Sequence, residues 1–176
     1  MTLMRMHAGA WLLAAALATC GRADAAGPVG RLAPDCSLSL TGGAGPVSLR
    51  ALRGKVVYVD FWASWCAPCA VSFPFMNQLS RSNRAKGFEV VAVNLDRESR
   101  DATAFVARRS PDFDVAMGDN RGCARAFGVE SMPQSYLIDR SGVVRWTHAG
   151  FRPAEAGEVA AAVASLLAPS GAPAGP

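Results

Sequence analysis

The chain has 176 residues, of which 51% are hydrophobic and 18% charged, and its formal net charge is +4. This length favours one domain, large enough to bury a core without added cross-links. No run of 18 consecutive apolar residues occurs, which excludes a bundle of membrane-spanning helices. The basic residues are scattered, with Arg108-Arg109 as the longest run, so they indicate a solvated surface and no nucleic-acid partner.

Residues 1–25 are typical of a secretory signal peptide. One arginine precedes an apolar run over residues 8–18, and Ala23-Asp24-Ala25 fits a cleavage site of the small-x-small type. The residues that end at Cys20 also resemble a bacterial lipobox, although Thr19 fits that pattern poorly. Lipid attachment at Cys20 is therefore the alternative to simple cleavage near Ala25. Both routes predict an extracytoplasmic protein, periplasmic in a bacterium with two membranes.

Residues 26–34 are rich in Gly, Pro and Ala and predict a linker, and residues 168–176 predict a disordered tail. Residues 35–167 between them are expected to form one domain. The hydrophobic patterns predict these elements in chain order: a hairpin of strands at 36–40 and 47–49, a strand buried on both faces at 55–62, a helix at 67–84, a strand at 88–95, a helix at 98–109, a strand at 114–117, a helix at 121–127, a hairpin of strands at 134–139 and 143–148, and a helix at 155–167. This order predicts an α/β fold, a mixed central sheet with helices on both faces.

The pentapeptide Trp65-Cys66-Ala67-Pro68-Cys69 follows a buried strand and opens a helix. The free N–H groups and the dipole at a helix N-terminus stabilise a thiolate. Cys69 comes one helical turn after Cys66, within reach of a disulfide. We therefore predict that Cys66 is an exposed nucleophile and Cys69 a buried resolving thiol.

The two residues between the cysteines also carry information. Pro68 lies in the first turn of the helix, where the missing N–H is not needed. Strong oxidants place a histidine between their cysteines, which stabilises the reduced form. Ala67 and Pro68 carry no charge, which predicts a more reducing pair. A zinc site is disfavoured by the spacing, because the chain has a single CxxC and no HxxxH.

Residues 59–69 resemble the active-site stretch of thioredoxins, and Pro74 matches the proline within the helix that follows it. Ser131-Met132-Pro133 resembles the cis-proline loop of that family. Residues 33–35 and 54–57 are similar to the TlpA/ResA branch of exported thiol–disulfide reductases. The resemblance covers residues 32–167. It implies a thioredoxin fold with an extra N-terminal β-hairpin.

The resemblance also implies roles for single residues. The branch usually has Asn at position 60. This chain has Asp60 instead, and thioredoxin itself also has Asp there. A carboxylate buried there would have a raised pKa and accept the proton of Cys69 through water. The backbone of Met132, next to a cis Pro133, would meet an extended substrate peptide. Trp65 and Met132 would line an apolar contact surface around the reactive sulfur.

These features predict reduction of protein disulfides by thiol–disulfide exchange, with no organic cofactor and no metal. The resemblance implies a membrane electron donor of the DsbD/CcdA type. The substrate stays open between apocytochrome c, as in cytochrome c maturation, a copper-site assembly protein and misoxidised proteins in general. One alternative is a copper-carrying thioredoxin-fold metallochaperone, but such carriers resemble a CxxxC pattern. Another is a thiol peroxidase, but Ala63 stands where that chemistry needs Thr or Ser.

Cys36 stands where the branch usually has a core phenylalanine, and Cys123 lies in the predicted helix before the cis-proline loop. The hairpin packing of the branch allows these two segments to be neighbours. Two interpretations remain open: a structural disulfide between Cys36 and Cys123, or two buried free thiols.

Overall fold

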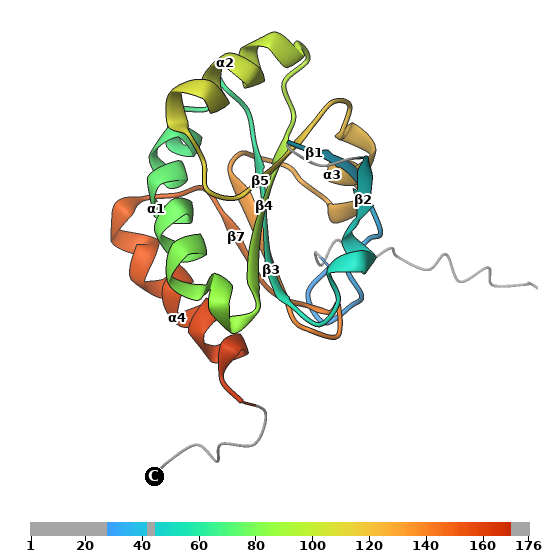
Figure 1. The fold of residues 1–176 in the computed structure, drawn as a ribbon, viewed down its shortest axis with the longest axis vertical. Helices are drawn as coiled ribbons and strands as arrows, with labels where there is room; N and C mark the ends of the chain where they lie inside the picture. Colours follow the sequence, from blue (N-terminus) through green and yellow to red (C-terminus); the bar gives the residue numbers. More distant parts are fainter. Residues whose placement is uncertain (1–27, 42–44, 170–176) are drawn as a thin grey trace, which may run out of the picture.

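Strand β3, which spans Val56–Trp62, is an interior strand of the sheet in the computed structural model of the protein (Figure 1). The structure describes residues 28–41 and 45–169, so the expected signal peptide, Cys20 and residues 170–176 of the expected tail lie outside it. Seven strands form one sheet in the order β2-β1-β5-β4-β3-β6-β7. The expected α/β fold with an N-terminal hairpin is confirmed.

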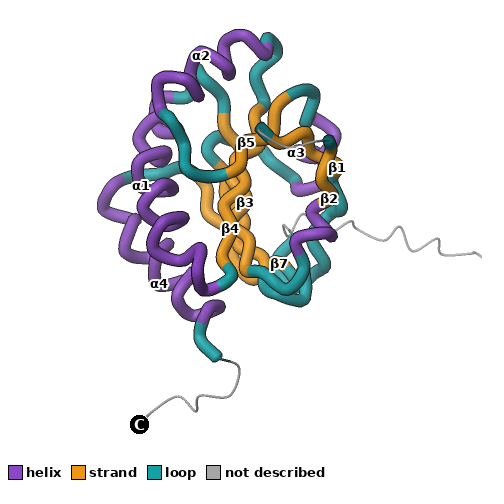
Figure 2. The backbone as a smooth tube through the Cα atoms, in the orientation of Figure 1, coloured by secondary structure: helices purple, strands orange, loops and turns teal. Residues whose placement is uncertain are grey.

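The middle of the sheet is parallel and its edges are antiparallel. Figure 2 shows the strands in orange, with the purple helices around them. All seven residues of β3 are buried, as its nearly continuous apolar run predicts for a strand covered on both faces. The other strands are β1 (Ser37–Leu40), β2 (Pro46–Ser48), β4 (Phe88–Asn94), β5 (Asp114–Met117), β6 (Gln134–Ile138) and β7 (Val144–Ala149).

The helices cover both faces of the sheet. Three pack on one face, and α3 packs on the other face with the N-terminal hairpin (Figure 1). Their bounds are α1 (Ala67–Asn83), α2 (Ser99–Arg109), α3 (Arg121–Phe127) and α4 (Ala156–Leu167), with short 3-10 helices at Leu49–Leu52, Arg84–Lys86 and Pro153–Glu155. Within the described ranges, no helix has both the length and the apolarity to cross a membrane.

The pleat of β3 divides its side chains between two cores. Val56, Tyr58 and Trp62 belong to the core under α1 and α4, whereas Val57, Val59 and Phe61 belong to the core under α3. Successive side chains of a strand point to opposite faces, so Asp60 lies on the α1 face with Tyr58 and Trp62. This alternation places one carboxyl group in an apolar core.

Two segments differ from the prediction. Residues 30–33, expected within a linker, pair with the start of β7: Gly30 N–H donates to the Val144 carbonyl at 2.8 Å, and Ala33 N–H to the Gly142 carbonyl at 2.9 Å. Leu49, expected at the end of a strand, begins a 3-10 helix instead. The physical reason is Ser48, whose side chain caps that helix by accepting a hydrogen bond from the N–H of Arg50.

Candidate active site

The two cysteines of the CxxC motif lie at the N-terminus of α1. Cys66 is the N-cap residue, and its sulfur accepts a hydrogen bond from the N–H of Cys69 at 3.2 Å. The two sulfurs are bonded in a disulfide, with a Cα–Cα distance of 5.2 Å. The sulfur of Cys66 therefore occupies the position where a helix terminus stabilises negative charge.

The surroundings of the two sulfurs are unequal. Cys66 is 5% exposed and Cys69 is fully buried, so the order of exposure is the expected one. Cys66 is nevertheless far less exposed than the sequence suggested, because in this oxidised form it is bonded to Cys69 and packs on the core beneath α1. Trp65, at 71% exposed, and Pro68 form the open surface beside the disulfide.

The loop between β3 and α1 is anchored by Asp96. The backbone N–H of Ser64 donates to Oδ2 of Asp96 at 2.9 Å, and the Ser64 hydroxyl to Oδ1 at 3.0 Å. Asn94 holds the same carboxylate through its side-chain amide at 2.8 Å. Sequence reasoning missed Asp96, although an acidic residue directly after a buried parallel strand is a signal for the site at that edge of the sheet.

The peptide bond between Met132 and Pro133 is cis. Pro133 is buried just before β6, and its carbonyl accepts a hydrogen bond from the N–H of Gly150 at 2.7 Å. Met132 is half-buried and packs against the core cluster that contains Cys66 and Cys69. The structure thus brings the Met132-Pro133 segment to the same core as the two cysteines.

Asp60 is 1% exposed and lies in the middle of β3. Its Oδ1 accepts a hydrogen bond from the Ser135 hydroxyl at 2.6 Å, and its Oδ2 has no hydrogen-bond partner among the described residues. Burial raises the pKa of Asp60 to about 7, and the hydrogen bond from Ser135 opposes that rise. A carboxyl group with this pKa can both accept and release a proton near neutral pH.

Two residues of this arrangement were not singled out from the sequence. The Tyr58 hydroxyl donates to Ser135 Oγ at 2.8 Å, and both side chains are buried. Tyr58 precedes Asp60 by two residues and so shares its face of β3. Ser135 could have been noticed as a polar residue within the mainly apolar strand that follows Pro133. Its hydrogen-bond partner, however, depends on the register between β3 and β6, which the sequence does not give.

Comparison with known proteins decides the family. The Redoxin family model matches residues 28–166, nearly the whole described chain. The chain belongs to the redoxin family. The expected resemblance to the ResA branch is also confirmed, as the relatives below indicate.

The thiol-disulfide oxidoreductase ResA of Bacillus anthracis is 35% identical to this redoxin over 98 residues, which cover 56% of this chain and 57% of the relative. ResA of Geobacillus thermodenitrificans is 34% identical over 117 residues, 66% of this chain and 67% of the relative. Among solved structures, a Chlorobium tepidum protein assigned as the thiol:disulfide interchange protein DsbE has a TM-score of 0.74 at 47% identity, covering 78% of this chain and 96% of that one. The alignment to the Bacillus proteins thus spans little more than half of their length.

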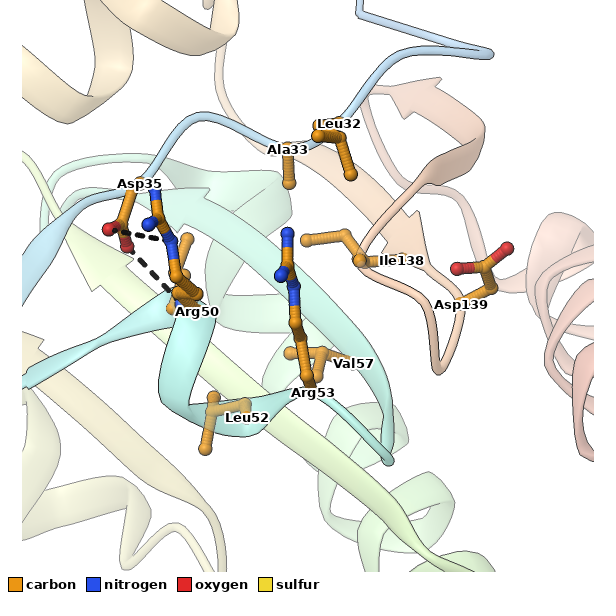
Figure 3. Close-up of a pocket in the computed structure, with 11 residues that line it drawn as sticks. Leu32, Ala33, Asp35, Arg50, Leu52, Arg53, Val57, Ile138 and Asp139 are labelled. Atoms are coloured by element: carbon orange, nitrogen blue, oxygen red, sulfur yellow. Dashed lines mark hydrogen bonds and ion pairs between the residues drawn. The ribbon is translucent and has the colours of Figure 1, made fainter.

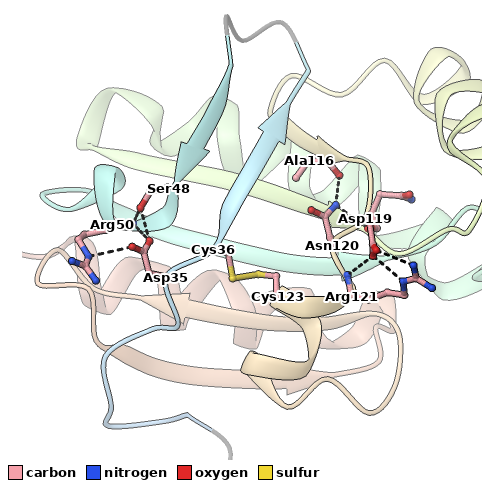
Figure 4. The surroundings of a disulfide bond; sticks show 10 residues. Asp35, Cys36, Ser48, Arg50, Ala116, Asp119, Asn120, Arg121 and Cys123 are labelled. Atoms are coloured by element: carbon pink, nitrogen blue, oxygen red, sulfur yellow. Dashed lines mark hydrogen bonds and ion pairs between the residues drawn. A yellow bond between two sulfur atoms is a disulfide. The ribbon is translucent and has the colours of Figure 1, made fainter.

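The other two cysteines of the redoxin domain also form a disulfide in the structure (Figure 4). Cys36 and Cys123 are 87 residues apart, with a Cα–Cα distance of 5.5 Å. The bond ties the residue before β1 to α3, on the face of the sheet opposite α1. Beside it, the Asn120 side chain donates to the carbonyls of Asn94 and Ala116 and so joins α3 to the ends of β4 and β5.

A small cavity of about 90 Å³ lies at the other end of β3 (Figure 3). Val57 and Ile138 form part of its apolar wall, and Arg50 pairs with Asp35 at its rim. Val57 is near the start of β3, whereas Cys66 follows the end of that strand. About 16 Å of extended chain separates Val57 from Trp62, so the cavity is not part of the cysteine site.

The described part of the redoxin domain contains no cluster of side chains that could bind a metal ion. In residues 28–41 and 45–169, no group of three or more His, Cys, Asp and Glu side chains is placed to bind one.

Proposed function

We propose that the protein is an exported thiol–disulfide oxidoreductase that acts mainly as a reductase of protein disulfides. One observation carries the proposal: a disulfide whose outer sulfur, that of Cys66, caps the helix α1 beside the exposed ring of Trp65. Membership of the redoxin family and the relatives named ResA and DsbE support this assignment.

The reaction starts from the reduced pair. The Cys66 thiolate attacks one sulfur of the substrate disulfide, forms a mixed disulfide and releases the other substrate sulfur as a thiolate. Cys69 then loses its proton to Asp60 through water and attacks the sulfur of Cys66. The second substrate thiolate leaves, and the Cys66–Cys69 disulfide remains. Two electrons have passed from the protein to the substrate.

An extended peptide of the substrate would contact the open surface beside Cys66. Trp65 and Pro68 supply exposed apolar area, and Met132 lies half-buried next to the same core. Met132 and Pro133 supply the backbone segment that an extended chain would lie along. These four residues are the substrate-binding set of the proposal.

The reductase direction rests on the uncharged residues Ala67 and Pro68 between the cysteines. Each turnover leaves the pair oxidised, so a thiol donor must reduce it again. For a protein exported by residues 1–25, that donor is a membrane protein of the DsbD/CcdA type. The redox-active disulfide is the sole redox group that this reaction requires.

Substrate trapping tests the proposal. The Cys69→Ala variant keeps the attacking sulfur and lacks the resolving one, so it should accumulate mixed disulfides with its substrates. Reduced Cys69→Ala protein would be incubated with an extract of extracytoplasmic proteins, and the adducts separated without reductant and identified by mass spectrometry. The control is the variant Cys66→Ser/Cys69→Ala, which should trap nothing. Equal trapping by both variants, or no insulin reduction by the native protein, contradicts the proposal.

A further inference from the structure

The carboxyl group of Asp60 is held by one oxygen only. Oδ1 accepts the 2.6 Å hydrogen bond from Ser135, whereas the buried Oδ2 has no partner among the described residues. A buried polar atom without a partner is uncommon in folded proteins, and such atoms concentrate where a group does chemistry. The two oxygens of Asp60 are therefore not equivalent.

The hydrogen bond to Oδ1 has a fixed direction. The Tyr58 hydroxyl donates to Ser135 Oγ at 2.8 Å, and the single proton of the Ser135 hydroxyl points to Asp60. All three residues are closed to solvent, because Tyr58 and Ser135 are each 2% exposed and Asp60 is 1% exposed. The chain from Tyr58 to Ser135 to Asp60 is thus a static support for the carboxylate, with no exit to solvent for a proton.

The row of residues across the sheet contains no cation next to Asp60. Its neighbour on β4 is Ala92, its neighbour on β6 is Ser135, and His148 of β7 lies beyond Ser135. Burial disfavours the charged carboxylate, and the hydrogen bond from Ser135 is the interaction that favours it.

We propose that Ser135, held by Tyr58, is a positioning residue that occupies Oδ1 of Asp60 and leaves Oδ2 as the base for the Cys69 proton. The inference rests on the proposed function, because it concerns the step in which Cys69 resolves the mixed disulfide. In that step the proton leaves Cys69 Sγ and arrives at Oδ2 through water. The electron pair left on Cys69 forms the bond to Cys66, and the substrate leaves as a thiolate.

The other titratable groups on this face of the sheet are few. On β3 itself, burial raises the pKa of Tyr58 further above its ordinary value, which is already well above neutral pH. On β7, His148 stacks on Trp146 and lies 3.2 Å from a carboxylate oxygen of Glu155. The described residues that α1 and α4 bury over this face, apart from Cys66 and Cys69, are apolar or hydroxyl side chains. His148→Gln is accordingly the control variant for the pH profile.

The first measurement is the ionisation of Asp60 in the oxidised protein, where the cysteines do not titrate. Carboxyl carbon NMR against pH should give a midpoint near 7 for the native protein. Ser135→Ala should raise that midpoint by about one pH unit, a tenfold increase in proton affinity, because the bond that favours the carboxylate is lost. Ser135→Thr keeps the hydroxyl and should stay within about 0.3 unit of the native midpoint. An unchanged midpoint in a folded Ser135→Ala protein overturns the proposal.

The second measurement isolates the resolving step. A reduced protein mixed with a nitrobenzoate disulfide releases one coloured thiolate when Cys66 attacks and a second when Cys69 resolves. The rate of the second release against pH should have its inflection near the native Asp60 midpoint, and the inflection should move upward with Ser135→Ala. Asp60→Asn should lack it, and His148→Gln should keep it. If the native protein releases no second thiolate, the proposed function fails. If it does, and Ser135→Ala leaves the inflection in place, only the role of Ser135 fails.

Tyr58→Phe provides an independent variant, because Ser135 keeps its bond to Asp60 and loses only its own donor. We expect a smaller upward shift of the Asp60 midpoint, and no further shift when Tyr58→Phe is added to Ser135→Ala. Additive shifts contradict a role of Tyr58 through Ser135. Should Ser135→Ala fail to fold, an unshifted midpoint in Tyr58→Phe counts against the proposal by itself.

Discussion

The sulfur of Cys66 accepts a 3.2 Å hydrogen bond from the backbone N–H of Cys69, while the sulfur of Cys69 is fully buried. One cysteine of the pair therefore has an N–H donor and a helix terminus directed at it, and the other lies among apolar side chains. Opposite effects on the two thiols follow, because a donor stabilises a thiolate and burial destabilises it.

In the reduced protein we expect Cys66 to react with iodoacetamide at neutral pH at least about ten times faster than Cys69, the ratio that one pKa unit supplies. Mass spectrometry of peptides after a short exposure measures the two rates. The Cys66→Ser variant serves as the control, since its remaining site thiol should react slowly. Faster labelling of Cys69 would reverse the two assignments.

The reduction potential of the Cys66–Cys69 pair should lie near that of thioredoxin, about −270 mV, and far from that of DsbA, about −120 mV. The reason is the absence of a charged or histidine residue between the cysteines. Equilibration with glutathione or dithiothreitol buffers, followed by alkylation, gives the value. A potential above about −170 mV would point to an oxidase or isomerase.

The sequence predicts most of the fold, because its strongest signals are local. The mainly apolar runs at 55–62 and 88–95 identify buried strands, and the structure has β3 and β4 there. The short 3-10 helix at Leu49–Leu52 escaped prediction, since a single serine cap decides between strand and turn. The pairing of residues 30–33 with β7 depends on a contact between segments more than 100 residues apart, for which the sequence holds no local pattern.

In the candidate site, too, local relationships could be predicted from the sequence and long-range contacts could not. Cys66, Cys69 and Pro68 lie within one short segment, so their relation follows from helix geometry. The contact between Asp60 and Ser135 joins residues 75 apart and exists only in one register of β3 against β6. A shift of that register by one residue would turn Ser135 to the other face. Such a partner becomes visible only in the folded structure.

Asp60 should make the stability of the protein depend on pH. Its pKa is about 7 when folded, against about 3.9 in an unfolded chain, so the folded state binds more protons between these values. The free energy of unfolding should therefore fall as pH rises from 4 to 7. In Asp60→Asn this contribution is absent, and the variant should gain about 4 kcal/mol relative to the native protein between pH 4 and pH 8.

Urea unfolding of both oxidised proteins at several pH values measures that difference. Because the free energies of the native protein and of Asp60→Asn are subtracted at each pH, the contributions of groups that titrate alike in both proteins cancel. A difference that does not change with pH would mean that Asp60 is ionised in the folded protein as readily as in the unfolded one.

Trp65 should contribute to binding of protein substrates and little to stability, because 71% of it is exposed. We expect Trp65→Ala to raise the KM for insulin several-fold and to leave the reaction with a small nitrobenzoate disulfide nearly unchanged. The matched control is Val71→Ala, another exposed apolar residue, on the outer side of α1. An equal loss of activity with both substrates would mean that Trp65 affects the reactivity of Cys66, and would contradict a role in binding protein substrates.

The Cys36–Cys123 disulfide should stabilise the domain without taking part in exchange. It closes a loop of 87 residues, for which loop entropy allows at most about 5 kcal/mol. The double variant Cys36→Ala/Cys123→Ala should lose between about 2 and 5 kcal/mol in urea unfolding and keep its insulin reductase activity at temperatures where it is folded.

Non-reducing peptide mapping of the native protein is the decisive measurement for this pair. Mild reductant should open Cys66–Cys69 first and leave a peptide that joins Cys36 to Cys123. We expect this order because the N-terminus of α1 stabilises the Cys66 thiolate and therefore the reduced form of that pair. Two alkylatable thiols at Cys36 and Cys123 in the denatured, unreduced protein would contradict the disulfide.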